Sequence, residues 1–448
     1  MLAFGAREDG VLRSPADRGR SPRGGRVTVL RIGLTGGIAC GKSEVARRFA
    51  TAGLEILDLD RLAHGLMAPG LPAHADVVEA FGRGVLAPDG SIDRRALGAI
   101  VFASTEARER LDRLVHPRVR EAEAQRAQAL ASRPGSVLVT DAALLVEAGM
   151  HLRFDRLVVV HCRPEQQVAR LRSRDSLSEE QALARVAAQM PIETKRRFAH
   201  FHVDSSGTLS ETEGQADTLA GTLVDLAGNR PPPIVLSRAR VLGALLEGPS
   251  RGPRGLGPEK LAAHLVSHDG VELSALAQMM DPPIPRPWYQ VGFAAPAESE
   301  AATLVVPPVL FDLARHGHDP ERLAASAHSL AWLADPYPER VASAVLMALV
   351  MAEVAAAGRV APDLENRSRP WRAVAARWGK GEAGPSVVAA MRAAVRHSRD
   401  AQAARAACAA AGVEPGLAGA IVGVAGGGRD EPATAWEPFL RGLGAPTG

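Results

Sequence analysis

Residues 36 to 43 read Gly-Gly-Ile-Ala-Cys-Gly-Lys-Ser and match the pattern G-x-x-x-x-G-K-[ST]. The apolar stretch 29–34 before them predicts a strand, and Val45 and Phe49 after them are spaced by one helical turn. Strand, glycine-rich loop and helix therefore follow one another in the order of a P-loop. The backbone N–H groups of such a loop, and the positive end of the helix after it, attract a polyphosphate. We therefore predict a nucleoside triphosphate site here, since a chance match in a glycine-rich chain would lack these flanks.

The motif assigns a role to each of its polar members. Lys42 would lie near the β- and γ-phosphates, and the Ser43 hydroxyl would bind Mg²⁺ together with phosphate oxygens and water. The residues predicted to contact the nucleotide are Gly36, Gly37, Ile38, Ala39, Cys40, Gly41, Lys42, Ser43 and Glu44, joined by Arg170 further along the chain.

Composition narrows the class of protein. A chain of 448 residues is long for one hydrophobic core, so we expect two domains. The net charge of +3 is too small to argue for a nucleic-acid partner. The longest apolar run, 341–357, is interrupted by Ser343 and Glu353, so no membrane segment is predicted. The cysteines lie far apart and form no metal-ligand cluster, which fits a reducing cytoplasm: Cys40, Cys162 and Cys408.

Acidic residues follow several of the apolar stretches. Segment 53–60 predicts a second strand that ends in Asp58 and Asp60, and segment 136–141 predicts another that ends in Asp141. Stretch 157–162 is apolar throughout, as in a fully buried parallel strand, and 201–204 predicts the last strand. We therefore predict an α/β fold with a parallel sheet. An Asp at such a strand end can hold Mg²⁺ through water or accept a proton, although a solvated strand end is an equal alternative.

Two helical regions complete the first half. The segment from Ala103 to Ala131 predicts a helix that His116-Pro117 interrupts, which would place His116 at a helix junction. Residues 165–189 predict a helix, a turn and a second helix that Ser178 caps. The arginines on this pair could close over phosphates as a lid, or could simply form a solvated charged face: Arg170, Arg174 and Arg185.

At this point the chain resembles the dephospho-coenzyme A kinase family over about residues 29 to 225. The stretches that carry the resemblance occur in the family's order: 33–38, 57–60 with Ala63-His64, 89–94, His116-Pro117, 144–147, 170–175 and 187–189. The resemblance implies a three-layer P-loop fold with a helical lid. It also implies transfer of the ATP γ-phosphoryl group to the ribose 3′-hydroxyl of dephospho-CoA, with Mg²⁺ required.

The resemblance also implies site roles. Asp60 would be the base that orients the hydroxyl, and Lys42 and Arg174 would complete the catalytic set. The residues expected to face the acceptor are His64, Arg94, His116, Leu144 and Glu147. Several positions depart from the family pattern: Ala39-Cys40 replace Gly-Ser, Glu44 replaces a Thr and could weaken nucleotide binding, Ala143 and Val146 replace Pro and Phe, His200 replaces an Asp, and Ser205 replaces an Asn.

The second half predicts helices without a motif that assigns chemistry. It is faintly similar to the ADP-ribosylglycohydrolase family but lacks that family's clustered acids, and the trio His264, His268 and Asp269 is a weak metal candidate. We predict a disordered extension over 1–27, the kinase domain over 28–228, a Pro-rich linker over 229–237, a helical domain of unknown role over 238–425, and a flexible tail over 426–448. A start codon assigned too early, or a basic arm, would also account for 1–27.

Three functions remain open from the sequence: the kinase, a nucleotide-sensing regulatory protein, and a kinase for another nucleoside or nucleotide acceptor. We expect ATP and dephospho-CoA as small-molecule partners, no nucleic acid and no membrane, and a cytoplasmic location. The oligomeric state is not predicted. We also expect the kinase part to work without the helical part, because a proline-rich break separates them.

Overall fold

The structure is a computed structural model that describes residues 29–231, 244–245, 258–268, 276, 279, 302, 305–334 and 337–427. The predicted extension over 1–27, most of the predicted linker over 229–237 and nearly all of the tail beyond 427 lie outside the described residues.

A five-stranded parallel sheet forms the centre of the first half, in the strand order β2-β3-β1-β4-β5. The strands are β1 (Leu30–Gly36), β2 (Glu55–Asp58), β3 (Val137–Asp141), β4 (Arg156–His161) and β5 (Phe201–Asp204). Every residue of β4 is buried, as its apolar sequence predicts for an inner parallel strand. Because the strands run parallel, their carboxyl ends meet at one edge of the sheet, where the P-loop begins.

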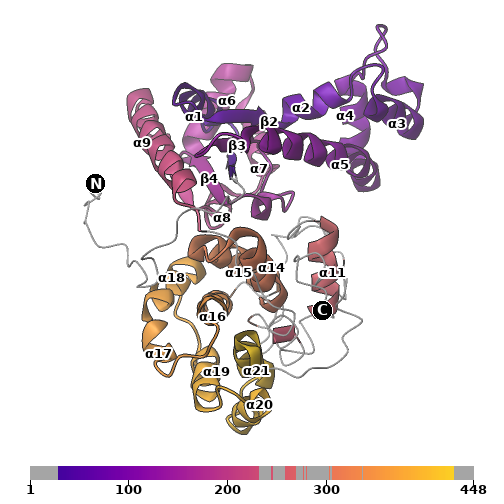
Figure 1. The fold of residues 1–448 in the computed structure, drawn as a ribbon. Coiled ribbons are helices and arrows are strands. Elements are labelled where there is room, and N and C mark those ends of the chain that lie inside the picture. The colour runs from indigo at the N-terminus through magenta and orange to yellow at the C-terminus, as the bar shows by residue number, and fades with distance from the viewer. Residues whose placement is uncertain are drawn as a thin grey trace.

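Helices cover both faces of this sheet (Figure 1). α1 (Lys42–Thr51) and α9 (Leu209–Gly228) pack on one face through Val45, Phe49 and Leu223. The other helices of this half are α2 (Leu59–Leu66), α3 (Pro72–Phe81), α4 (Arg94–Ala103), α5 (Thr105–Leu130), α6 (Pro164–Asp175), α7 (Glu179–Ala187) and α8 (Ile192–Arg196), with the 3-10 turns η1 (Arg83–Val85) and η2 (His151–Arg153). The predicted three-layer α/β fold with a helical lid is confirmed.

The predicted break at His116-Pro117 is wrong, because α5 runs continuously from Thr105 to Leu130 with Pro117 inside it. A proline removes one helix hydrogen bond and pushes the preceding turn open. The guanidinium of Arg118, the residue after the proline, donates to the carbonyl of Leu114 one turn earlier at 2.7 Å. Val115 and Val119 on either side of the proline are buried in the core, so tertiary packing holds the helix together. His116 therefore lies within a helix.

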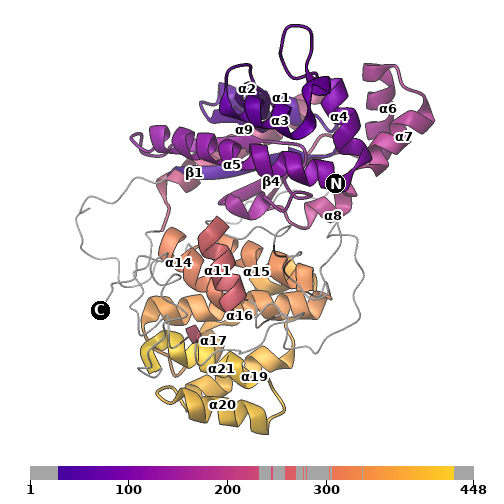
Figure 2. The same cartoon turned by 90° about the vertical axis from the view of Figure 1, so that its right-hand side faces the viewer.

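The second half is helical in its described residues (Figure 2). Its helices are α11 (Pro258–His268), α14 (Val306–His316), α15 (Pro320–Ala334), α16 (Pro338–Ala357), α17 (Leu364–Arg367), α18 (Arg369–Gly379), α19 (Pro385–Arg396), α20 (Ala401–Ala410) and α21 (Pro415–Val422), followed by the π-helical turn η5 (Gly423–Gly427). Within the described part of the chain, α16 is the one helix long and apolar enough to cross a membrane, but 78% of that stretch is buried inside the protein. It is the central core helix of this half.

The two halves share one continuous hydrophobic cluster. It joins Phe154, Leu157 and Phe198 of the α/β half to apolar residues of α14, α15 and α16. α8 lies at the border of the α/β half that faces α14 and α15 (Figures 1 and 2). His200, at a position where the resemblance predicts an Asp, packs its ring against Trp378 of α18 with 5.3 Å between ring centroids. A neutral ring suits this buried place better than a carboxylate would.

Candidate active site

The phosphate loop, residues 36–43, connects β1 to α1 and needs glycine at two places. Gly41 precedes the first residue of α1 with a φ of 78°, a left-handed conformation that glycine adopts without strain. A Cβ atom on Gly36 would lie 2.5 Å from the Val160 carbonyl oxygen of the neighbouring strand. The loop therefore turns tightly against the sheet and directs the start of α1 toward the space above the strand ends.

Two glutamines hold the middle of the loop. The backbone N–H of Ile38 donates to Gln189 at 2.8 Å, and the side chain of Gln167 donates to the Ile38 carbonyl at 2.9 Å. Gln167 comes from α6 and Gln189 from the turn after α7, so the lid helices are attached directly to the phosphate loop. A movement of the lid would therefore be transmitted to the loop.

Arg170 contacts the same loop from α6. Its guanidinium donates to the carbonyl of Ala39 at 3.4 Å and to the carbonyl of Ser205 at 2.7 Å. The Ser205 hydroxyl in turn donates to the Cys40 carbonyl at 2.8 Å. The predicted nucleotide-site residue Arg170 thus lies beside the loop and adds a positive charge there.

Lys42 extends from the first position of α1 to the carboxylate of Asp141 at the end of β3. Burial raises the pKa of Asp141; the ammonium group of Lys42 opposes that rise, while Asp58 and Asp60 add to it. Asp58 also pairs with Asp141 across β2 and β3 in the strand register. The structure therefore brings one cation and three carboxylates together at the carboxyl edge of the sheet.

Asp58 and Asp60 differ in what their side chains do. Asp58 is the N-cap of α2, and its carboxylate accepts a hydrogen bond from the Arg61 N–H at 2.9 Å. The strand ends at Asp58 and not at Asp60 as predicted; Asp60 lies in the first turn of α2, is exposed, and accepts no hydrogen bond from the described residues. Of these two acids, Asp60 is the one whose carboxylate is available to a substrate hydroxyl.

Lys195 of α8 is a site residue that sequence reasoning missed. Its ammonium group is fully buried and donates to the carbonyls of Gly36 at 3.3 Å and Ala143 at 3.0 Å. It also forms an ion pair with Glu147 at 2.8 Å. Burial lowers the pKa of Lys195, and Glu147 acts in the opposite direction. Lys195 therefore ties the start of the phosphate loop to segment 142–147, a link that no local sequence signal marks.

Three of the other predicted acceptor residues lie on a helical arm formed by α2 to α5. His64 is in the last turn of α2, Arg94 is the exposed first residue of α4, and His116 lies in α5 with its Nε2 3.4 Å from Asp112. α2 and α4 both pack on α5, so the three residues belong to the structural unit whose first helix, α2, carries Asp60. Leu144, in the turn after β3, is 49% exposed and faces solvent.

Arg174 lies on the exposed lid. Its guanidinium binds Asp175 through two hydrogen bonds of 2.8 and 3.0 Å, and Arg185 of α7 joins the same carboxylate at 2.8 Å. The predicted capping box of Ser178 with Gln181 is present at the start of α7. The lid hairpin is therefore stabilised locally and carries its arginines at the surface.

Two departures from the family pattern acquire a structural account. The carboxylate of Glu44 accepts from Arg47 at 3.1 Å, a hydrogen bond that lowers the pKa of Glu44, and Arg47 also binds Glu213 at 2.9 Å. Arg47 therefore offsets part of the negative charge of Glu44. Cys40 packs its sulfur 3.5 Å from that of Cys162, and the hydrogen bond between the two thiols lowers the pKa of Cys162 to about 7. Both are free thiols.

The residues at the loop fit a magnesium ion that is held mainly by its nucleotide. Among the residues that the structure describes, no group of three or more His, Cys, Asp or Glu side chains could hold a metal. The Ser43 hydroxyl is exposed at the start of α1, and Asp141 lies at the adjacent strand end. One hydroxyl and nearby carboxylates suit Mg²⁺, which keeps several waters and phosphate oxygens as ligands.

Comparisons with known proteins find relatives of the first half of the chain. A family model described as dephospho-CoA kinase matches residues 30–211. The dephospho-CoA kinase of Geobacter sulfurreducens is 45% identical over 188 residues, which cover 42% of this chain and 95% of that protein. That of Corynebacterium glutamicum is 39% identical and covers 44% of this chain and 98% of that protein. The crystal structure of TT1252 from Thermus thermophilus is 33% identical with a TM-score of 0.38, covering 44% of this chain and 98% of that one.

Proposed function

The chain belongs to the dephospho-CoA kinase family, and from that premise we propose which of its residues carry out the reaction and how. The enzyme transfers the γ-phosphoryl group of ATP to the ribose 3′-hydroxyl of dephospho-CoA, the last step of coenzyme A biosynthesis. The observation that carries the assignment of roles is the meeting of Lys42, Asp141 and Asp60 at one edge of the sheet.

Lys42 neutralises the phosphates during transfer. It starts at the first position of α1, so its ammonium group and the N–H groups of residues 36–43 approach the same anion. Its contact with Asp141 keeps the long side chain near the strand ends. Phosphoryl transfer depends mainly on positioning and on charge stabilisation, which this arrangement provides before the substrate arrives.

Asp60 orients the 3′-hydroxyl and takes its proton. As the hydroxyl oxygen forms a bond to the γ-phosphorus, the bond from that phosphorus to the β–γ bridging oxygen breaks and ADP leaves. The hydroxyl proton passes to Asp60, because Asp58 is committed to capping α2. His64, Arg94, His116, Leu144 and Glu147 would then contact the acceptor, and Arg170 and Arg174 would surround the nucleotide from α6.

Mg²⁺ would bind at Ser43 and at oxygens of the ATP phosphates, and would supply charge stabilisation to the transferring group. The protein's own contribution is to position the Ser43 hydroxyl, and beside it Asp141, at the mouth of the phosphate loop. We further infer a cytoplasmic location, since the described cysteines are free thiols and ATP and dephospho-CoA are expected as soluble partners.

A nucleotide sensor and a kinase for another acceptor are not favoured by the relatives. An ADP-release assay with dephospho-CoA, beside a panel of other nucleosides, tests the substrate. We expect Asp60→Asn to lower kcat by about 10²- to 10⁴-fold, the range that general-base catalysis contributes. Asp58→Asn is the matched control, because its amide oxygen can still accept from Arg61. Full turnover by Asp60→Asn would end the assignment of the base.

A further inference from the structure

The two chain segments that form the ion pair between Lys195 and Glu147 also contact the helical half. Phe198 follows Lys195 by three residues, and His151 follows Glu147 by four. The rings of His151 and Phe198 meet edge to face with 5.1 Å between their centroids. The two chain segments that carry the ion pair are therefore joined a second time, three residues after Lys195 and four residues after Glu147.

This second junction rests on α15. The Ser329 hydroxyl lies 3.1 Å from Nε2 of His151, and Phe198 packs against the rings of His328 at 5.2 Å and Trp332 at 5.8 Å. All of these contacts are buried apart from Trp332, which is partly buried. One face of α15, with its residues spaced by three and four positions, thus supports both segments.

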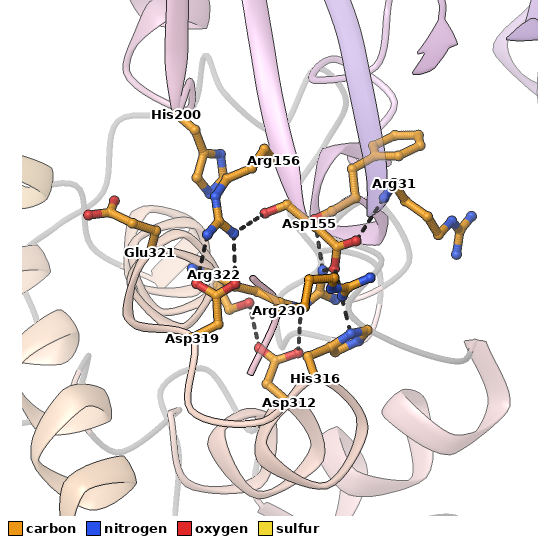
Figure 3. A network of polar contacts seen from close by, with 12 residues as sticks. Arg31, Asp155, Arg156, His200, Arg230, Asp312, His316, Asp319, Glu321 and Arg322 are labelled. Atoms are coloured by element: carbon orange, nitrogen blue, oxygen red, sulfur yellow. Dashed lines mark hydrogen bonds and ion pairs between the residues drawn. The ribbon is translucent and has the colours of Figure 1, made fainter. Parts of the chain in front are cut away.

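A separate group of ion pairs docks the helical half at the start of β4 (Figure 3). Arg156 at the start of β4 binds Asp319 through two hydrogen bonds of 2.9 Å. Burial alone would raise the pKa of Asp155, but Arg230 and Arg322 lower it to about 2. These charges hold α15 against the α/β half without touching α8.

We propose that α15 positions the Lys195–Glu147 pair, so that the helical half is a built-in support of the active site; this rests on the proposed function. Lys195 holds the carbonyls of Gly36 and Ala143, which belong to the phosphate loop and to the acceptor segment. Lys195 keeps its position beside these two carbonyls only while α15 supports α8 through Phe198. α8 has five residues and little stability of its own. His151 and Phe198 are positioning residues that act through this pair.

If α15 positions the Lys195–Glu147 pair, the kinase part depends on the helical part, contrary to the expectation from the sequence that it works alone. A proline-rich break indicates a linker, but it carries no information on how much surface the linked parts bury. The shared hydrophobic cluster places Phe198 and Leu157 in contact with the helical half, and both are almost fully buried there.

Two serines of α15 provide a matched test in the full chain. Ser329 and Ser326 are both buried and each makes one side-chain hydrogen bond, Ser329 to His151 across the interface and Ser326 to Asp312 within the helical half. We expect Ser329→Ala to lower kcat/KM for dephospho-CoA about threefold, and Phe198→Leu about tenfold, typical of coupling through packed contacts. Ser326→Ala should lower the Tm by about as much as Ser329→Ala does, but its kcat/KM should equal that of the wild type.

Hydrogen–deuterium exchange gives a readout independent of activity. Residues 142–147 and 189–197 should exchange faster in Ser329→Ala and Phe198→Leu than in the wild type, and at the wild-type rate in Ser326→Ala. Unchanged exchange and kinetics in the first two variants, or an equal effect in Ser326→Ala, would overturn the proposal. A wild type that does not phosphorylate dephospho-CoA would instead count against the proposed function, and the exchange measurement would still decide this one.

Discussion

The interface between the two halves should weaken when the pH falls below about 6.5. His151 and His328 are buried in it and both pack against Phe198, and burial lowers the pKa of each to about 3. For His328, the neighbouring His151, Arg197 and Lys380 lower the pKa further. Both rings are therefore neutral in the folded protein at any pH near neutrality.

The sign follows from proton binding. In the unfolded chain a histidine has a pKa of about 6.5 and takes up a proton below it, while the folded protein takes up none until about pH 3. The stabilisation is therefore complete above about pH 6.5 and is lost as the pH falls below it. Below about pH 6.5, each histidine lowers the free energy of unfolding by about 1.4 kcal/mol per pH unit. Lowering the pH from about 7 to about 5 should therefore lower the free energy of unfolding by about 2 kcal/mol for each histidine and by about 4 kcal/mol for both.

Urea unfolding followed by circular dichroism at about pH 7 and about pH 5 measures this loss. Burial raises the pKa of Asp312 and that of Asp141. Over part of the pH range these two carboxyls therefore raise the free energy of unfolding as the pH falls, opposite to the effect of the histidines. The difference between wild type and His328→Phe removes their contribution, because the carboxyls remain in both proteins. The variant should lose about 2 kcal/mol less on acidification than the wild type does.

His397→Phe, at the end of α19, changes a partly exposed histidine and should leave the pH dependence as it is in the wild type. Equal losses in wild type and His328→Phe would refute the reasoning, since they would mean that the ring at position 328 is not held neutral by the interface.

Three further predictions concern the active-site half. Asp58→Ala removes the N-cap of α2 and should lower the free energy of unfolding by about 1 kcal/mol in a urea titration, whereas Asp58→Ser should retain most of it. Glu44→Ala should leave the KM for ATP within about twofold of wild type, because Glu44 already pairs with Arg47, whose side chain is exposed, and solvent screens such charges; a tenfold lower KM would contradict this. Lys195→Met leaves Glu147 without its buried cation and should lower the free energy of unfolding by about 3 to 5 kcal/mol, so an unchanged urea midpoint would show that the pair is dispensable.

The features that could be predicted from sequence depend on residues close together in the chain. The P-loop needs Gly36 to Ser43 between a strand and a helix, and the cap of α7 needs only Ser178 and Gln181. The buried strand β4 could be identified because a parallel inner strand has no polar face to show. The family resemblance added the roles of Asp60 and of the acceptor residues, which remain proposals.

What the sequence by itself determined was therefore the α/β fold, the nucleotide loop and the kinase family, since these follow from local patterns. Only the tertiary structure decided that α5 continues through Pro117, because the packing of Val115 and Val119 outweighs a missing hydrogen bond. Only the tertiary structure placed Lys195 against Gly36, more than a hundred residues away, and α15 beneath Phe198. Such contacts depend on burial between distant segments, and burial is a property of the packed chain that no short stretch of residues encodes.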